Sequence, residues 1–276
     1  MKSNHNMNGS FVPGLIDNPK IHASWALHYS KFVTAYKQEG VDFWGLTVQN
    51  EPEFAAPWDA CVYRAEDQRD FIKDFLGPRL RQDHPYLKLM IFDHNRDDVL
   101  KFAKPILTDP EAAQYVDGVA FHWYSSGDYQ NVLAVHENFP DRFVLATEAC
   151  HCPGVILNDW DRGEAYGFDI INDINNYAAG WVDWNIVLDM QGGPNHLKNY
   201  CDAPIILDAS TQTVHYQVMY YFLGHFSKYV FPGSVRINVV FDESKLPGVI
   251  ATGFLTPANT VVVIVMNQSE KDQEIS

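Results

Sequence analysis

Two glutamate residues follow short apolar runs and are the residues best suited to acid–base or nucleophilic chemistry. Glu51 comes three residues after the apolar run 43–48, and Glu148 comes two residues after the run 143–146. Two carboxyl groups that face each other across a cleft can cleave a glycosidic bond, because one protonates the leaving oxygen while the other attacks the anomeric carbon or activates water. The pattern therefore predicts a glycosidase. For a double displacement we expect the two carboxyl groups to lie about 5 Å apart.

The neighbours of these glutamates bear on the same chemistry. The amide of Asn50 can hydrogen-bond a sugar 2-hydroxyl, and Pro52 is expected to restrict Glu51 to an extended backbone. His122 follows another apolar run, and a histidine there is more often packed and hydrogen-bonded than a base. Cys150 is expected to be a small wall residue, because no base that would activate it as a nucleophile is visible beside it.

The order of the elements predicts a parallel β-sheet with helices outside it. Apolar runs of strand type alternate with segments of helical periodicity, which is typical of βαβ units. The predicted strands are residues 43–48, 87–92, 116–121, 143–146 and 181–188. The predicted helices are residues 65–80, 98–107, 129–138 and 161–179. Gly77-Pro78 predicts a kink or an early stop in the first of these helices.

A (β/α)8 TIM barrel fits this order better than an open doubly wound sheet, because no glycine-rich phosphate loop follows any predicted strand. Barrel enzymes carry their chemistry at the carboxyl ends of the strands, and here those ends are rich in polar and aromatic residues. Residues 215–228 predict a last helix, and antiparallel β-runs follow it at residues 235–240, 248–254 and 260–266. We therefore predict a partial TIM-barrel catalytic domain over residues 1–230, with about strands 4–8 present, and a partial β-sandwich domain over residues 231–276.

Composition excludes several classes of partner. The chain has 20 Lys and Arg against 35 Asp and Glu, a net charge of −15, whereas a nucleic-acid-binding protein needs a basic face. No run approaches the roughly 20 apolar residues of a transmembrane helix. The four cysteines fit no zinc-ligand spacing, so we expect thiols with room for one disulfide bridge, no metal and no cofactor.

The longer motifs resemble the glucosylceramidases, the acid β-glucosidases of glycoside hydrolase family thirty. The resemblance runs from about residue 4 to the end of the chain. It rests on Asn50-Glu51-Pro52, His122-Trp123-Tyr124, Thr147-Glu148-Ala149-Cys150, Trp160-Asp161-Arg162-Gly163, Trp184-Asn185, Gly192-Gly193-Pro194-Asn195 and Leu223-Gly224-His225-Phe226-Ser227-Lys228.

The resemblance implies a role for individual residues. Glu51 would be the general acid/base and Glu148 the nucleophile of a retaining mechanism. Trp184 would form the floor of the glucose subsite, and the residues that match the family's free thiols are Cys61 and Cys150. The substrate-binding set predicted in this way is Asn50, Tyr124, Trp184, Asn199, Tyr200, Trp58, His122 and Cys150. Within it, Tyr200 replaces a phenylalanine of the family, and the loop that carries Trp58 is shorter than the family's.

The resemblance also implies hydrolysis of glucosylceramide to glucose and ceramide. The substrate would be a glycosphingolipid at a membrane surface, with a lipid-presenting activator protein as partner, in the lysosome or outside the cell. A β-glycosidase acting on β-xylosides or β-1,6-glucans, and an inactive remnant that binds sugar or lipid, stay open as alternatives.

Counterparts of the family's first barrel strands are not found, so the chain is expected to be incomplete at both ends. An open barrel leaves sheet edges unpaired and one side of the core in water, so the isolated chain is expected to fold poorly and to turn over little substrate.

Overall fold

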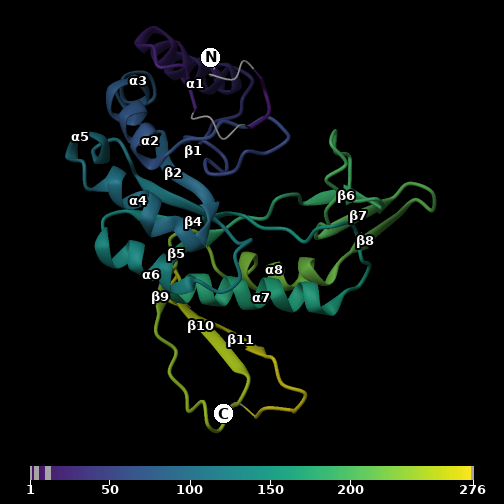
Figure 1. The fold of residues 1–276 in the computed structure, drawn as a ribbon. Helices are drawn as coiled ribbons and strands as arrows, with labels where there is room; N and C mark the ends of the chain where they lie inside the picture. The colour runs from purple at the N-terminus through teal and green to yellow at the C-terminus, as the bar shows by residue number, and fades with distance from the viewer. Residues whose placement is uncertain (1, 3–5, 10–13, 275–276) are drawn as a thin grey trace. The chain divides into compact units, whose positions relative to one another are not determined.

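The computed structural model describes residues 2, 6–9 and 14–274, and the chain divides into two compact units (Figure 1). The first unit contains residues 1–147 and 178–180, and the second contains residues 148–177 and 181–276. Each unit is described by itself. The division passes between Thr147 and Glu148, whereas the domain boundary predicted at residue 230 stays a prediction.

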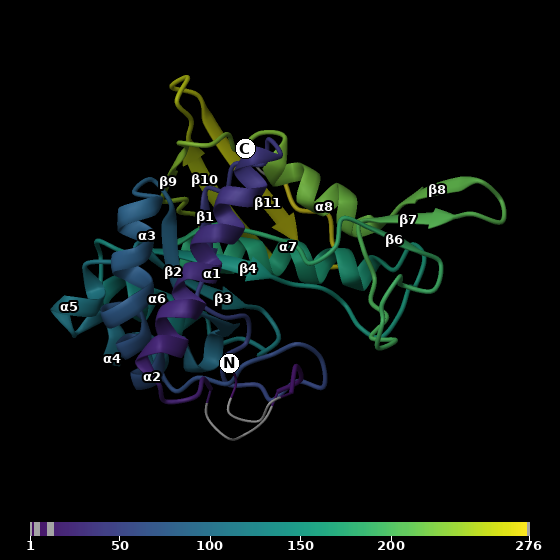
Figure 2. The same ribbon diagram turned by 90° about the horizontal axis from the view of Figure 1, so that it is seen from above.

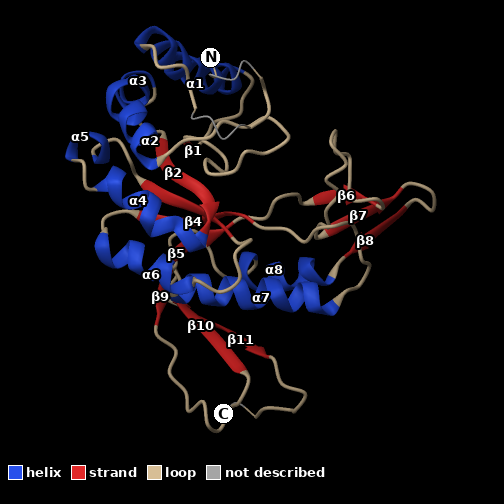
Figure 3. Ribbon diagram, in the orientation of Figure 1, coloured by secondary structure: helices blue, strands red, loops and turns tan. Residues whose placement is uncertain are grey.

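A five-stranded sheet, ordered β1-β2-β3-β4-β5, organises the first unit (Figure 3). Strands β1 and β2 pair in parallel, as do β2 and β3. The strands are β1 (Gly45–Thr47), β2 (Lys88–Asn95), β3 (Gly118–His122), β4 (Phe143–Glu148) and β5 (Ala178–Trp181). Strand β3 buries all five of its residues and β2 buries five of its eight, as expected for a parallel sheet covered on both faces. The predicted parallel sheet is thus confirmed.

The fifth strand of the sheet does not lie where the sequence predicted it. A strand was predicted over residues 181–188, but β5 ends at Trp181, residues 182–186 are irregular, and another strand begins at Val187. The alternating apolar residues of that run are exposed, with Val182 at 48%, Trp184 at 50% and Ile186 at 70%. Although these residues occupy alternate positions, the run is not a half-buried strand, because their side chains do not face a packed core.

The helices of the first unit lie outside its sheet. Helix α4 packs against β2 and β3, and α2 and α6 pack against α4 (Figure 2). The helices are α1 (Pro19–Gln38), α2 (Ala65–Phe71), the π-helix η1 (Ile72–Leu76), α3 (Gly77–Asp83), the 3-10 helix η2 (Arg96–Asp98), α4 (Val99–Leu107), α5 (Pro110–Ala113) and α6 (Tyr129–Asn138).

Gly77-Pro78 does not stop the helix predicted over residues 65–80. A π-helical turn joins α2 to α3, and Pro78 lies in the first turn of α3, where its missing N–H is needed least. Gly77 is required by packing, because a Cβ atom there would lie 2.3 Å from the ring of Tyr115.

The second unit holds helices α7 (Trp160–Asn175) and α8 (Val218–Ser227) and two three-stranded sheets. The antiparallel sheet of β9 (Val235–Ile237), β10 (Val249–Leu255) and β11 (Val261–Asn267) confirms the predicted C-terminal β-region. Phe254 and Ile264 of this sheet pack on Ile170 and Ile174 of α7. The other sheet was not predicted and consists of β6 (Val187–Asp189), β7 (Ile205–Asp208) and β8 (Thr213–Tyr216), so the last helix begins at residue 218 and not at 215.

Candidate active site

Glu51 lies in a tight turn directly after β1. Its φ is 46°, so the extended backbone expected from Pro52 is wrong. Two hydrogen bonds hold the turn: the Glu51 N–H donates to the Asp93 carbonyl at 2.8 Å, and the Phe54 N–H donates to the Glu51 carbonyl at 3.0 Å. A left-handed backbone at a residue other than glycine persists only where its surroundings impose it, and such residues cluster at functional sites.

Asp93 is the hub of polar contacts at the ends of the strands. It lies at a bulge in β2, where the register with β3 shifts and its own φ is 71°. Its carboxylate accepts hydrogen bonds from the hydroxyl groups of Thr47 and Thr147, both at 2.6 Å. Burial by itself would raise the pKa of Asp93, but the hydrogen bonds from His122, Thr147 and Thr47 outweigh burial and lower it. Asp93 is therefore a buried, ionised carboxylate.

His122, at the end of β3, lies between two carboxyl groups. Its Nε2 is 3.2 Å from Asp93 Oδ1, its Nδ1 is 3.2 Å from Glu51 Oε1, and only 1% of its side chain is exposed. The expectation of a packed, hydrogen-bonded histidine is confirmed, and its partner is the predicted acid.

The two contacts of His122 admit two proton arrangements. In one, Nε2–H donates to Asp93 and a protonated Glu51 donates to Nδ1; in the other, an imidazolium donates to both carboxylates. These arrangements differ only in the position of one proton between Glu51 and His122. Glu51 can thus exchange a proton with His122 without losing its hydrogen bond to the imidazole.

The remaining residues predicted in the first unit surround this turn. Tyr124 is 41% exposed, and its ring meets that of His122 edge-on at 6.1 Å. Trp58 is half-buried and contacts Phe54 edge-on at 5.8 Å, and the side chain of Asn50 is exposed.

His94 was not singled out from the sequence. Its Nδ1 is 3.9 Å from Glu51 Oε1, and burial lowers its pKa. The signal that could have found it is the polar run Asp93-His94-Asn95 at the end of a buried strand.

Glu148 ends β4 and is half-buried. The chain that follows it is held against the segment of Trp184, because the Trp184 N–H donates to the Ala149 carbonyl at 2.9 Å. The Trp184 side chain is 50% exposed and borders a cavity of about 920 Å³. That cavity is lined by aromatic side chains that include Trp181, Tyr220 and Tyr221. An exposed indole at the wall of such a cavity is suited to pack on the C–H face of a sugar ring.

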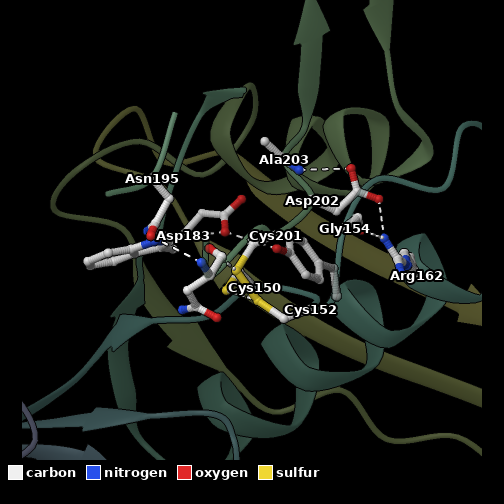
Figure 4. Close-up of a disulfide and its surroundings, with 12 residues drawn as sticks. Cys150, Cys152, Gly154, Arg162, Asp183, Asn195, Cys201, Asp202 and Ala203 are labelled. Carbon is white, nitrogen blue, oxygen red and sulfur yellow. Dashed lines mark hydrogen bonds and ion pairs between the residues drawn. A yellow bond between two sulfur atoms is a disulfide. The ribbon is translucent and has the colours of Figure 1, made fainter. Parts of the chain in front are cut away.

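A disulfide joins the segment after Glu148 to the one that carries Asn199 and Tyr200. Cys152 is bonded to Cys201, and the buried thiol of Cys150 lies 3.6 Å from the Cys152 sulfur (Figure 4). Backbone hydrogen bonds flank this disulfide, from Gly154 N–H to the Tyr200 carbonyl and from Asp202 N–H to the His151 carbonyl, both at 2.8 Å. Tyr200 is half-buried and Asn199 is exposed. The one bridge for which the sequence left room is therefore present, and Cys61 and Cys150 are thiols outside it, as the resemblance implied.

Asp183 places a titratable carboxyl group beside Trp184. Its Oδ1 accepts hydrogen bonds from the Tyr166 hydroxyl at 2.9 Å and from the Trp184 N–H at 2.8 Å, whereas its Oδ2 is buried without a hydrogen-bond partner among the described residues. Burial raises the pKa of Asp183 to about 7. The folded protein thus binds a proton at this position that the unfolded chain releases above about pH 4.

We expect Asp183→Asn to remove a pH-dependent part of the stability. Because the folded-state pKa of Asp183 is raised, its protonation adds stability as the pH falls below about 7, and the gain is complete below about pH 4. Between pH 8 and pH 5 the unfolding free energy should rise by about 3 kcal/mol more in the wild type than in Asp183→Asn. Urea denaturation at both pH values measures this, with the exposed Asp272→Asn as control. Equal pH dependence in the wild type and Asp183→Asn would contradict the prediction.

The predicted residues therefore form one group around Glu51 in the first unit and another after Glu148 in the second. The expected distance of about 5 Å between the two carboxyl groups stays a prediction. Among the described residues, no helix has both the length and the apolarity needed to cross a membrane.

Comparison with known proteins identifies the family. The family model "Glycosyl hydrolase family 30 TIM-barrel domain" matches residues 1–230, and "Glycosyl hydrolase family 30 beta sandwich domain" matches residues 233–276. The putative glucosylceramidase 4 of Caenorhabditis elegans is 42% identical over 92% of this chain and 51% of its own length. The lysosomal acid glucosylceramidase of Mus musculus is 37% identical over 99% of this chain and 55% of its own length.

Among solved structures, the endo-β1,6-glucanase BT3312 superposes with a TM-score of 0.84 at 29% identity, over 94% of this chain and 58% of that one. The chain spans about half the length of the curated relatives it matches. Both family models together match almost all of its residues. The chain belongs to glycosyl hydrolase family 30, with the TIM-barrel and β-sandwich architecture of that family.

Proposed function

We propose that the protein is a retaining β-glucosidase that hydrolyses glucosylceramide to glucose and ceramide by double displacement. The observation that carries the proposal is the hydrogen-bonded row Glu51–His122–Asp93, which lets Glu51 exchange a proton in place. The names of the Caenorhabditis elegans and mouse relatives support glucosylceramide as the substrate.

In the first step the Glu148 carboxylate attacks the anomeric carbon, while Glu51 protonates the leaving oxygen of ceramide. The bond between the anomeric carbon and that oxygen breaks, and a covalent glycosyl-enzyme forms. In the second step Glu51, now a carboxylate, removes a proton from water, which attacks the anomeric carbon and releases glucose with its configuration retained. When Glu51 gives up its proton, His122 stays neutral with Nε2–H donated to Asp93, and the proton that Glu51 removes from water in the second step restores the starting arrangement.

The other predicted residues receive binding roles under this proposal. The exposed amide of Asn50 holds the sugar 2-hydroxyl, and Trp184 forms the floor of the glucose subsite. Asn199 and Tyr200 line the edge of that subsite, on the segment that the disulfide Cys152–Cys201 fixes, and Cys150 forms part of the nearby wall. Tyr124, beside His122, and Trp58, on the aromatic entrance loop, complete the proposed substrate-binding set.

The substrate class sets the expected surroundings of the protein. A glycosphingolipid is presented at a membrane surface, and a lipid-presenting activator protein would give the site access to the sugar headgroup. The lysosomal location of the mouse relative supports the lysosome, with secretion as the alternative.

Covalent trapping tests the mechanism without requiring fast turnover. A 2-fluoro-β-glucoside with an activated leaving group should label the protein once, and the label should map by mass spectrometry to the peptide that contains Glu148. Release of glucose from glucosylceramide in anionic vesicles tests the substrate. Labelling at another carboxylate would contradict the assignment of the nucleophile, and binding of glucose-like ligands without labelling would indicate an inactive remnant.

A β-1,6-glucanase is the second candidate, because the similarity to BT3312 extends over most of the chain. A β-xylosidase is the other alternative, and one assay of product release distinguishes all three activities. Faster product release from a β-1,6-glucan or from an aryl β-xyloside than from glucosylceramide would replace the proposed substrate and leave the roles of Glu51 and Glu148 unchanged.

A further inference from the structure

Three ligand atoms of the first unit converge beside the turn after β1. Glu51, His94 and His122 each offer one ligand atom, and these three atoms all lie within 4.8 Å of one another. Glu51 Oε1 is 3.2 Å from the nitrogen of His122 and 3.9 Å from that of His94. The three residues come from the turn after β1, from β2 and from β3. Their spacing in the sequence therefore does not predict that they lie together.

These separations approach those of a metal site. Ligand atoms bound to one transition-metal ion at about 2.0–2.2 Å lie roughly 3.0–3.5 Å apart. Imidazole nitrogens combined with one carboxylate oxygen suit divalent ions such as Zn²⁺. His94 Nδ1 is buried and has no hydrogen-bond partner among the described residues, so a metal ion would satisfy an atom that the protein leaves unsatisfied.

The surroundings of His122 match those of a ligand histidine. A metal-binding histidine usually gives its second ring N–H to a carboxylate, which fixes the tautomer and directs the other nitrogen at the metal. His122 Nε2 faces Asp93 Oδ1 at 3.2 Å, and the Asp93 side chain is only 9% exposed and is held by Thr47 and Thr147. This arrangement leaves Nδ1 as the metal-facing nitrogen.

We propose that Glu51, His94 and His122 form a binding site for Zn²⁺ or a similar divalent transition-metal ion, with Asp93 orienting His122. Three protein ligands leave further coordination positions for water. A bound ion would hold the Glu51 carboxylate and prevent it from carrying a proton. Under the proposed function the metal would therefore inhibit hydrolysis, although binding itself does not depend on that function.

Among the described residues one other group could bind such an ion, and the test must separate the two. The sulfur atoms of Cys150, Cys152 and Cys201 also lie within 4.8 Å of one another. The disulfide occupies two of them, so the oxidised protein presents only the Cys150 thiol there. Thiolate ligation of Co²⁺ gives a charge-transfer absorption that ligation by nitrogen and oxygen does not give.

Calorimetric titration of the chain with Zn²⁺, without substrate, should show one site. His94→Ala should weaken the affinity at least tenfold, and Asp93→Asn should weaken it by about 10–100-fold through the orientation of His122. Cys150→Ser and His28→Ala, an exposed histidine on α1, should bind like the wild type. Circular dichroism before each titration confirms that the variant is folded.

Spectra with Co²⁺ identify the ligands. We expect visible d–d bands that disappear in His94→Ala, without a thiolate charge-transfer band. Absence of Zn²⁺ binding, equal affinity in the wild type and His94→Ala, or a thiolate band lost in Cys150→Ser would each overturn the proposal. Because calorimetry needs no hydrolysis, these outcomes are independent of whether Glu51 is a catalytic acid.

Discussion

Replacing Glu148 by Gln should abolish covalent trapping by a 2-fluoro-β-glucoside. The amide has nearly the same shape as the carboxylate but cannot displace the leaving group and form a stable ester, so the label has no attachment point. Intact-mass spectrometry after prolonged incubation measures the result. Glu53→Gln, an exposed neighbour in the turn that contains Glu51, is the control and should be labelled like the wild type. Trapping that survives in Glu148→Gln would place the nucleophile at another residue.

The matching substitution of Glu51 should give a result that depends on the leaving group. A fluoride or dinitrophenolate leaves without protonation, so Glu51→Gln should form the glycosyl-enzyme with such reagents at nearly the wild-type rate. With a poor leaving group that needs a general acid, we expect a loss of about 10²–10⁴-fold. A uniform loss for both kinds of leaving group would show that the substitution disturbs binding and not proton transfer. If such reagents trap Glu51→Gln but not Glu148→Gln, then Glu148 is the nucleophile and Glu51 the acid.

The strands near the site could be predicted because a buried strand consists mostly of apolar residues. Residues 87–92 and 116–121 are predominantly apolar, and most of them are buried in the parallel sheet. The end of such a run also marks where polar side chains meet, which is why Glu51 and Glu148 could be selected as candidates. The same rule failed at residues 181–188, because Val182, Trp184 and Ile186 are exposed and are not buried in a sheet.

The contacts that hold Glu51 could not be predicted, since they depend on backbone geometry and on the order of the strands. The bulge in β2 turns the Asp93 carboxylate toward Thr47 and Thr147, which are 100 residues apart in the chain. The left-handed turn at Glu51 depends on the Asp93 carbonyl, whereas the local rule for a residue before proline predicts an extended backbone. Cysteine pairing has the same limit, because four cysteines allow three connectivities when all are paired.

Asp93→Ala should lower the unfolding free energy of the first unit by about 3–5 kcal/mol, because it removes a buried carboxylate that is hydrogen-bonded to three side chains. The substitution leaves His122 Nε2 without its carboxylate and removes the acceptor of two hydroxyl groups. It also places alanine at a φ of 71°, which costs about 1–2 kcal/mol relative to a residue that tolerates the left-handed region. Urea denaturation near pH 7 measures the total.

Two further variants separate the backbone cost from the loss of the carboxylate. Asp93→Gly tolerates the positive φ but has no acceptor, whereas Asp93→Asn tolerates the φ and keeps one acceptor oxygen for Thr47 or Thr147. We expect the unfolding free energy to decrease in the order wild type, Asp93→Asn, Asp93→Gly, Asp93→Ala. Because the pKa of Asp93 is lowered, its contribution is present above about pH 4 and is lost as the pH falls, so the wild type should approach Asp93→Asn in acid. If Gly and Ala were as stable as the wild type near neutral pH, the carboxylate would not be what holds Thr47, Thr147 and His122 together, and the orientation of the imidazole toward Glu51 would need another cause.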